Sequence, residues 1–468
     1  MAKNKIIPNI TIIDIAHKGK SIGKDENGYV YLIEGTVPGD VVNAVYYKKR
    51  KGLRVAKVLE YVSYSERRTE ALCEHFGVCG GCKWQHFQYD SQLYFKEKQV
   101  RDAIERIAML DGSIVESILR CDNIYYYRNK MEYSFCSKRW ITEEEAESHA
   151  EITDKKALGF HRPGYFSKVV NINTCHLQDD FGNQVRNFLH AFATEKEYSY
   201  YDYDTQRGLL RNVTLRNTSI DEWMVSVIFR ERDEEKIEDI MSAVQQKFPE
   251  ITSLYYVVNQ KQNDTLYDQE YHLYHGVPKI TEQLGNVKYK IGPKSFFQTN
   301  SLQAKNLYDV AVDMAELDAE DMVYDLYTGL GSIALYIADQ CKYVLGIEEI
   351  PQAIEDAKVN QSLNGIENAD FYTGDVKDIF TTDFIESNGS PDVVITDPPR
   401  AGMHEAVIDT LLKLEAPKIV YISCNPATQA RDIKLLSESY ELVKVKPVDM
   451  FPQTQHIESV ALLKLKQS

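Results

Sequence analysis

Two short motifs near the C-terminus place reactive side chains directly after apolar segments. Cys424 follows the run Ile-Val-Tyr-Ile-Ser and precedes Asn-Pro, while Asp397 follows Val-Val-Ile-Thr and precedes Pro-Pro-Arg. Open α/β sheets bind their ligands beyond the carboxyl ends of the strands, so a thiol and a carboxylate there are candidates for chemistry. The segment His456-Ile-Glu458 adds two titratable side chains. The sequence therefore offers a nucleophile and a base.

A glycine loop follows the first predicted strand of the same region. It reads Asp325-Leu-Tyr-Thr-Gly-Leu-Gly-Ser332, and Gly329 and Gly331 allow the backbone to approach a ligand where the next helix begins. Glu348 ends the following strand, where a carboxylate can accept both hydroxyls of a ribose. Acidic residues end four successive strands, at Asp325, Glu348, Asp375 and Asp397. One such carboxylate is often only a helix N-cap, and this alternative stays open for Asp375.

The type of nucleotide can be narrowed from the same residues. NAD and S-adenosylmethionine both fit a site of this kind. The glycine pattern is an incomplete dinucleotide fingerprint, because Ala334 occupies the position of the third glycine. The Asp-Pro-Pro motif and the cysteine have no role in hydride transfer. The residues therefore favour S-adenosylmethionine.

A second set of cysteines lies in the first half of the chain. Cys73, Cys79 and Cys82 share one short glycine-bearing segment, and Cys175 is a distant fourth thiol. Four thiolates suit either zinc or an iron–sulfur cluster, and their spacing does not separate the two. The N-terminus lacks an apolar export signal, so thiols that bind metal or react are expected instead of disulfides. The other cysteines are expected to be structural: Cys121, Cys136 and Cys341.

Hydrophobic patterning divides the 468-residue chain into three regions. Residues 1–62 contain short strand-like runs separated by glycines, which predicts a small OB-like β-barrel. Residues 63–288 predict a central α+β domain with a long helix over residues 91–109. Residues 289–468 alternate helices and strands, which predicts an α/β domain with a doubly wound, Rossmann-like parallel sheet.

Charge is distributed unevenly along the chain. The formal net charge is −16, which taken alone argues against a polyanionic partner, but residues 1–70 contain 13 Lys and Arg against 8 Asp and Glu. The excess peaks in Tyr46-Tyr-Lys-Lys-Arg-Lys-Gly-Leu-Arg54, where aromatic and basic side chains are interleaved as nucleic-acid binding requires. A solvated hairpin tip is an equally good interpretation. No run of about 18 apolar residues occurs, so we expect a cytoplasmic protein without a membrane partner. No protein partner can be inferred.

Several of these motifs together resemble the RNA uracil-5 methyltransferase family. They are Asp397-Pro-Pro-Arg, Ser423-Cys-Asn-Pro, His456-Ile-Glu and Lys294-Ser-Phe-Phe-Gln-Thr-Asn300. The resemblance implies S-adenosylmethionine-dependent methylation of uridine C5 in RNA. Cys424 would add to C6 of the base, and Glu458 would remove the C5 proton. The implied contacts to the cofactor or target base are Gln298, Tyr327, Gly329, Gly331, Glu348, Asp375 and Asp397.

The N-terminal half extends the resemblance. The barrel resembles a TRAM module, and the cysteine spacing resembles the [4Fe–4S] site of the branch of this family that acts on 23S ribosomal RNA. This implies a cluster on Cys73, Cys79, Cys82 and Cys175, with zinc as the alternative, and 23S ribosomal RNA as the substrate. Transfer RNA is the alternative substrate. A non-catalytic RNA-binding or assembly factor is a further alternative, against which the retained Cys424 and Glu458 argue.

Overall fold

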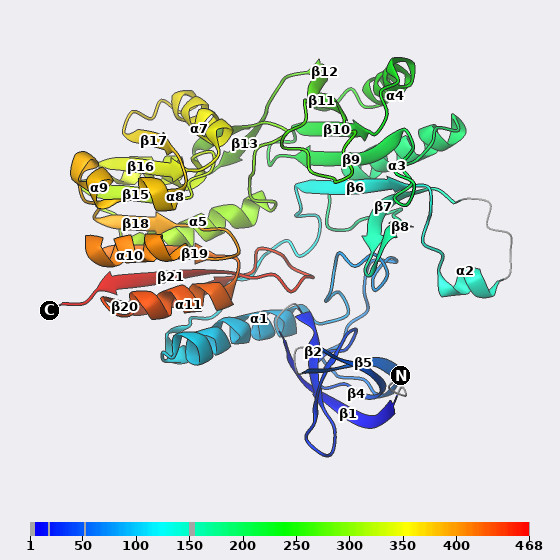
Figure 1. The fold of residues 1–468 in the computed structure, drawn as a ribbon, viewed down its shortest axis with the longest axis horizontal. Helices are drawn as coiled ribbons and strands as arrows, with labels where there is room; N and C mark the ends of the chain where they lie inside the picture. Colours follow the sequence, from blue (N-terminus) through cyan, green and yellow to red (C-terminus); the bar gives the residue numbers. More distant parts are fainter. Residues whose placement is uncertain (1–4, 17–18, 51–52, 149–154, 468) are drawn as a thin grey trace.

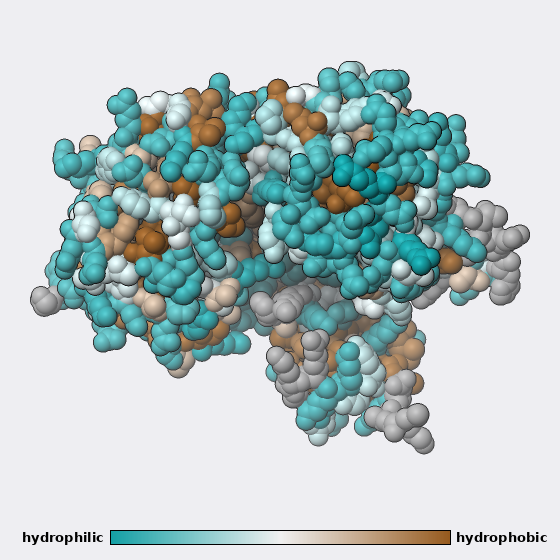
Figure 2. All heavy atoms as spheres, turned by 45° about the horizontal axis from the view of Figure 1, so that its top comes forward, coloured by the Kyte–Doolittle hydropathy of each residue, from teal (hydrophilic) through white to brown (hydrophobic). Residues whose placement is uncertain are grey.

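The computed structural model describes residues 5–16, 19–50, 53–148 and 155–467. Figure 1 shows a small N-terminal barrel below two larger bodies, a central sheet with helices and a C-terminal α/β unit. Hydrophilic residues dominate the face drawn in Figure 2, and apolar residues there form small separate patches. Within the described ranges, no helix is both long and apolar enough to cross a membrane.

The barrel confirms the prediction for the N-terminus. Five strands close on themselves in the order β1-β2-β3-β5-β4. Alternate residues such as Ile10, Ile12 and Ile33 point inward and are buried, as the period of two in a strand requires. Residues 51–52 of the basic segment lie outside the described residues. The strands are β1 (Lys5–Ile15), β2 (Ser21–Lys24), β3 (Val30–Ile33), β4 (Val41–Arg50) and β5 (Leu53–Ser63).

A mixed seven-stranded sheet forms the central body, in the order β12-β11-β10-β9-β6-β7-β8. The amphipathic helices α3 (Asp180–Glu195) and α4 (Glu234–Lys247) bury their apolar residues against it. The short helix α2 (Glu143–Glu147) lies beside it. The strands are β6 (Lys130–Cys136), β7 (Ala157–Arg162), β8 (Tyr165–Asn171), β9 (Leu210–Asn217), β10 (Trp223–Phe229), β11 (Ile251–Val258) and β12 (His272–Gly276).

The C-terminal sheet has the order β17-β16-β15-β18-β19-β21-β20, and apolar cores cover both of its faces. The first five strands are parallel, as predicted, but β21 pairs antiparallel with both β19 and β20. Its strands are β15 (Met322–Leu326), β16 (Tyr343–Glu348), β17 (Ala369–Thr373), β18 (Val393–Thr396), β19 (Lys418–Ser423), β20 (Tyr440–Val448) and β21 (Glu458–Leu465). Around it lie β13 (Ile280–Leu284), β14 (Val287–Ile291), α5 (Ser301–Ala315), α6 (Ser332–Ile337), α7 (Pro351–Leu363), α8 (Val376–Ile379), α9 (Thr382–Asn388), α10 (Glu405–Leu414) and α11 (Pro426–Leu436).

The long helix predicted over residues 91–109 is α1 (Tyr89–Ala103), which continues as a π-helical turn over residues 104–108. Its apolar residues Val100 and Ile104 are buried in the C-terminal core, although they precede that domain in sequence. Ile107 lies in the π turn, which changes the angular spacing of side chains, and it is 36% exposed. The helix therefore links the N-terminal half to the C-terminal sheet.

A buried ion pair anchors α1 to the loop that leads into β21. Lys96 Nζ lies 2.6 Å from Asp449 Oδ1, and both side chains are inaccessible to solvent. Lys96 also donates to the carbonyl oxygen of Phe451, and the Tyr89 hydroxyl donates to Asp449 Oδ2. The side chains of Gln92 and Gln453 complete the contact: Gln92 Nε2 donates to Gln453 Oε1, and the Gln453 backbone N–H donates to Gln92 Oε1. These contacts fix the segment that ends at Glu458.

We expect Lys96→Met to lower the free energy of unfolding by about 3–5 kcal/mol, because it leaves the Asp449 carboxylate buried without its cation. Chemical denaturation followed by circular dichroism measures the change. The matched control is Lys305→Met, since Lys305 pairs with Asp309 at 2.7 Å on the surface of α5. The control should cost less than about 1 kcal/mol. Equal losses in the two variants would contradict a role for the buried pair.

Candidate active site

The sheet topology brings Cys424 and Glu458 to the same edge. Cys424 directly follows β19, and Glu458 begins β21. Because β21 runs antiparallel to β19 and pairs Ser423 with Ser459, the start of one strand lies beside the end of the other. Thr396 ends the parallel strand β18 on the other side of β19, so Asp397 reaches the same edge. A thiol and two carboxyl groups therefore meet beyond three adjacent strands.

Burial controls the protonation of these groups. It raises the pKa of Glu458 well above its usual value, and the charge of Asp397 adds to the rise. The pKa of Cys424 rises to about 11, first through burial and then through Glu458 and Asp397. Burial and the charge of Asp325 raise the pKa of Asp397 to about 7. Burial therefore favours the thiol form of Cys424 and the uncharged form of Glu458 in the free site.

Arg400 is the positive charge in this acidic site. It lowers the pKa of both Cys424 and Glu458, against the effect of burial. Its backbone is held in place by Asn425 Nδ2, which donates to the Arg400 carbonyl oxygen at 3.0 Å. The sequence identified this arginine only as the residue that follows Pro-Pro. Only the three-dimensional structure shows that Arg400 lies near the thiol. In the sequence, the Asp-Pro-Pro-Arg motif was the one signal that pointed to this arginine.

The glycine loop forms a cradle at the end of β15. Asp325 Oδ2 accepts hydrogen bonds from Thr328 Oγ1 at 2.5 Å and from the Ala334 backbone N–H at 3.0 Å. Its other oxygen, Oδ1, is buried and has no hydrogen-bond partner among the residues that the structure describes, and burial raises the Asp325 pKa to about 7. Gly331 has φ of +80°, and a Cβ there would lie 3.1 Å from Phe371 and 3.2 Å from Ala357. The loop therefore lets its backbone come close to a ligand, and Asp325 Oδ1 can accept a hydrogen bond from that ligand.

Glu348 lies next to this cradle, as predicted from its place at the end of β16. The Gly329 backbone N–H donates to Glu348 Oε2 at 3.1 Å, and the Ile350 N–H donates to Oε1 at 3.0 Å. These bonds orient the carboxylate, and each oxygen keeps a lone pair for a hydroxyl group. The oriented Glu348 carboxylate, the Asp325 oxygen that has no partner in the described part of the chain, and the nearby acidic groups fit a ligand with hydroxyl groups and a positive charge, as S-adenosylmethionine has.

We expect three further residues to contact the cofactor or base, and each has contacts within the protein. Tyr327 adopts a left-handed backbone with φ of +67°, and burial raises its pKa to about 12, with a smaller effect from Asp375. Asp375 caps α8 by accepting from the Lys377 N–H at 3.2 Å, and it also pairs with the Lys377 ammonium group. The Gln298 carbonyl oxygen accepts from Asn129 Nδ2 at 3.0 Å. The contacts of Asp375 are therefore those of a helix N-cap. Ligand contacts by Tyr327, Asp375 and Gln298 stay predictions.

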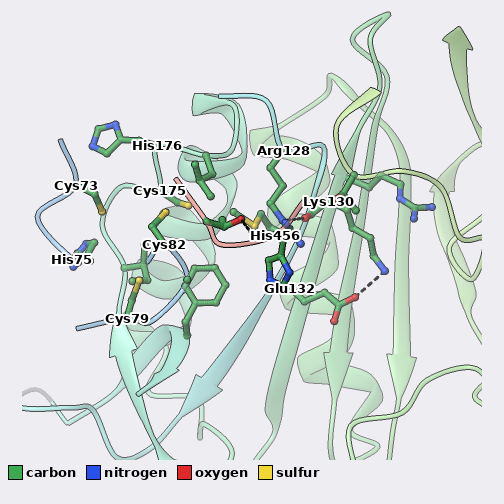
Figure 3. A pocket seen from close by; sticks show the side chains of 18 of the residues that line it. Cys73, His75, Cys79, Cys82, Arg128, Lys130, Glu132, Cys175, His176 and His456 are labelled. Carbon is green, nitrogen blue, oxygen red and sulfur yellow. Dashed lines mark hydrogen bonds and ion pairs between the residues drawn. The ribbon is translucent and has the colours of Figure 1, made fainter. Parts of the chain in front are cut away.

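The four N-terminal cysteines surround one pocket of about 550 Å³ between the cysteine loop (residues 73–82) and the central sheet. Figure 3 shows Cys73, Cys82 and Cys175 close together, with Cys79 lower on the same side.

Burial raises the pKa of Cys73 to about 11 and that of Cys82 to about 12, and the neighbouring thiols add to both. All cysteines are free thiols, and in the described part of the chain no three His, Cys, Asp or Glu side chains are grouped to hold one metal ion. Cys121, Cys136 and Cys341 are buried elsewhere, as expected of structural cysteines.

Comparisons with known proteins agree with this geometry. A family model described as tRNA (Uracil-5-)-methyltransferase matches residues 198–466, the region that contains the glycine loop and the strand-end cluster. An uncharacterized RNA methyltransferase of Bacteroides thetaiotaomicron is 45% identical over 97% of this chain and 100% of its own length. Another, from Porphyromonas gingivalis, is 46% identical over 97% of this chain and 98% of its own.

A solved structure has the same overall arrangement. It is the tRNA (uracil-54, C5)-methyltransferase of Pyrococcus abyssi in complex with S-adenosyl-L-homocysteine. It is 29% identical to this chain, with a TM-score of 0.76 over 97% of this chain and 99% of that one. The chain therefore belongs to the tRNA (uracil-5-)-methyltransferase family and is an S-adenosylmethionine-dependent RNA (uracil-C5)-methyltransferase.

Proposed function

We propose that the protein methylates C5 of a uridine in 23S ribosomal RNA through a covalent bond between Cys424 and C6 of the base. The observation that carries the covalent mechanism is the meeting of Cys424 and Glu458 at one sheet edge, with Asp397 and Arg400 beside them. C5 of uracil is too weak a nucleophile to accept a methyl group without activation. A thiol and a separate carboxyl group supply the two functions that the reaction needs.

The first step is addition of sulfur to the base. Cys424 Sγ loses its proton and bonds to C6, which moves the electron pair of the C5–C6 double bond toward C5 and the C4 carbonyl oxygen. S-adenosylmethionine, when bound, supplies an electrophilic methyl group on its sulfonium. C5 would bond to that methyl group as the methyl–sulfur bond breaks, with the electron pair of that bond left on the sulfur of S-adenosylhomocysteine. The base stays attached to Cys424 through C6.

The second step restores the double bond. The Glu458 carboxylate takes the proton from C5, and the released electron pair expels Cys424 Sγ from C6. Burial makes Glu458 a stronger base than an exposed carboxylate, because it raises the pKa of the group. The products are 5-methyluridine, S-adenosylhomocysteine and a free thiolate, which regains a proton. No electron enters or leaves the protein in this scheme.

The reaction should speed up as pH rises above 7. Cys424 and Glu458 must both lose a proton to act, and both have a raised pKa, so activity is lost as pH falls. Since Arg400 lowers both values, we expect Arg400→Gln to move the rising limb of kcat/KM to higher pH and to lower the rate several-fold at neutral pH. Initial methylation rates across a pH series measure this.

Arg400→Lys is the matched variant, because it keeps the positive charge and changes only the shape of the donor. It should keep the rising limb near the wild-type position. If Arg400→Gln and the wild type share one pH profile, Arg400 does not act on the charge of the thiol.

The choice of RNA is supported by the N-terminal half of the protein. A basic barrel joined to four cysteines resembles the branch of the family that acts on 23S ribosomal RNA. Transfer RNA is the second candidate, and the similarity to the Pyrococcus abyssi enzyme favours it. That similarity covers 97% of this chain, so the barrel by itself does not distinguish the two RNAs.

Mapping 5-methyluridine in ribosomal and transfer RNA from a deletion strain tests the choice. The proposal expects one or more sites to disappear from 23S ribosomal RNA and to return when the wild-type gene is restored. The complementing Cys424→Ala gene is the control and should restore none. Loss confined to transfer RNA would replace the ribosomal substrate by the second candidate.

The proposal also includes a [4Fe–4S] cluster on Cys73, Cys79, Cys82 and Cys175. Their thiols are close enough to raise the pKa of Cys73 and Cys82. Four thiolates suit either zinc or an iron–sulfur cluster. The resemblance of this cysteine spacing to the branch of the family that acts on 23S ribosomal RNA favours the cluster. Such a cluster would hold the cysteine loop against the segment around Cys175.

Protein purified without oxygen should contain about four irons and four acid-labile sulfides per chain. We expect Cys82→Ser to lose most of this iron, because it removes one ligand. Cys136→Ser is the control, since this buried cysteine lies in β6 with its thiol near the carbonyl oxygens of Lys138 and Ser167. One equivalent of zinc with no sulfide would contradict the assignment.

A further inference from the structure

An exposed aromatic group lies at the tip of the β7–β8 hairpin. The Tyr165 side chain is 56% exposed, and its ring centroid lies 5.1 Å from that of Trp140. The Arg162 guanidinium lies 5.2 Å from the Trp140 ring. These three residues are called the hairpin cluster. Two adjacent rings and a guanidinium are the components with which proteins stack and hold unpaired bases.

The hairpin cluster lies beside the cysteine loop, which lines the pocket described above. Arg162 Nη1 donates to the Val78 carbonyl oxygen at 3.1 Å, and Pro163 packs so closely on Gly80 that a Cβ there would lie 2.2 Å away. The hairpin tip is therefore fixed to the cysteine loop. That loop lines the pocket together with Phe160 of β7, and the pocket extends to His456, two residues before Glu458.

The charge of this segment suits a polyanion. Residues 155–178 contain four Lys and Arg and no Asp or Glu, although the chain as a whole has a net charge of −16. Two carboxylates from a neighbouring turn, Asp202 and Asp204, pair with Lys138 at 3.1 and 2.5 Å. Arg128, Lys130 and Lys294 line the pocket together with Glu132, which pairs with Lys130 at 2.8 Å. An RNA strand that follows this surface meets cations from the hairpin to the pocket.

We propose that the hairpin cluster is a stacking platform for an unpaired nucleotide of the RNA substrate, outside the site that holds the target uridine. A base stacks on the exposed Tyr165 ring, and Arg162 and the neighbouring cations hold the adjoining phosphates. The platform rests on the RNA methyltransferase activity and not on which RNA is modified. It adds affinity for single-stranded RNA without touching the reacting atoms.

Phe166 provides a matched control one residue away. Successive side chains of a strand point to opposite faces, so Phe166 lies on the other face of the hairpin. There it stacks on His161, with centroids 4.9 Å apart and ring planes inclined by 3°, and its side chain is 67% exposed. The two residues therefore have similar exposure on the same hairpin, but Tyr165 packs on Trp140, whereas Phe166 packs on His161 and Tyr203.

The test compares the affinity of full-length variants for a uridine-rich single-stranded RNA. Tyr165→Ala should raise the Kd by about 5- to 150-fold, the usual effect of losing one base–aromatic stack. Tyr165→Phe should keep wild-type affinity, and Phe166→Ala should change it by less than about twofold. The KM for RNA should rise in Tyr165→Ala while kcat at saturating RNA stays the same. Because binding needs no methylation, the test is independent of the proposed target.

Tryptophan fluorescence gives a second readout. Trp84 and Trp223 are only 2% and 6% exposed, whereas Trp140 is partly exposed and touches Tyr165, so a change on RNA binding reports mainly on the cluster. We expect single-stranded RNA to quench this fluorescence, an RNA duplex of equal length to quench it less, and Trp140→Phe to remove the response. Wild-type affinity in Tyr165→Ala, equal weakening in Phe166→Ala, or unchanged fluorescence would overturn the proposal and leave the surface to a protein partner.

Discussion

Cys424→Ala is expected to lower the rate of RNA methylation by on the order of 10⁴- to 10⁶-fold, the scale on which covalent enzymes lose activity with their nucleophile. Without sulfur on C6, C5 of the base has too little electron density to displace the methyl group. Transfer of labelled methyl groups into RNA, with protein in excess and long incubation, measures the residual rate. The binding of S-adenosylmethionine should be unchanged, because the cradle around Asp325 and Glu348 is untouched.

A trapping experiment tests the covalent bond itself. RNA that carries 5-fluorouridine should form a stable adduct with the wild-type enzyme, because fluorine does not leave C5 as a proton does. Cys424→Ala should form none. Cys341→Ala is the matched control, since this cysteine is buried just after the 3₁₀ turn that follows α6, with its thiol near the Ile337 carbonyl oxygen. An unchanged adduct in Cys424→Ala would refute the mechanism.

Glu458→Gln should block the second half of the reaction while leaving the first half intact. Glutamine has nearly the same shape but cannot accept the C5 proton, so the methylated base should remain attached to Cys424. Turnover should fall by about 10²- to 10⁴-fold, the usual contribution of a general base. An enzyme–RNA adduct with ordinary uridine, labelled by the transferred methyl group and stable in denaturing gels, is the expected signature.

The adduct separates a role as base from a merely structural one. A misfolded variant would form no adduct with ordinary or fluorinated RNA, whereas Glu458→Gln should form both. Glu441→Gln, an exposed glutamate on the neighbouring strand β20, is the control and should turn over normally. If Glu458→Gln loses activity without accumulating an adduct, another group removes the proton.

Local sequence was sufficient for much of the C-terminal unit. Apolar runs followed by Asp397, Cys424 or the glycine loop identified strand ends, because a buried parallel strand needs an uninterrupted hydrophobic segment and its ligand site lies at the carboxyl end. The closed N-terminal barrel was likewise predicted from short alternating runs. The π turn after α1 was not, since it depends on how the helix packs against the C-terminal core and not on its own periodicity.

The protonation of the active-site groups, and which residues contact one another, depended on contacts between segments that are distant in the sequence. The raised pKa of Glu458 results from burial and from Asp397, about 60 positions earlier in the chain. Arg400 became part of the site only because β18 and β19 are neighbours in the sheet. The ion pair of Lys96 with Asp449 joins residues 353 positions apart, so no local pattern reveals it.

The sequence by itself determined the chemical inventory of this protein: a thiol after a strand, a carboxylate after Ile457, a glycine loop with acids at strand ends, and four spaced cysteines. Only the tertiary structure decided that β21 enters the sheet antiparallel between β19 and β20, which sets Glu458 beside Cys424. The physical reason is that strand order and register are fixed by burial of both faces of the whole sheet, a property of the packed core that no single segment contains.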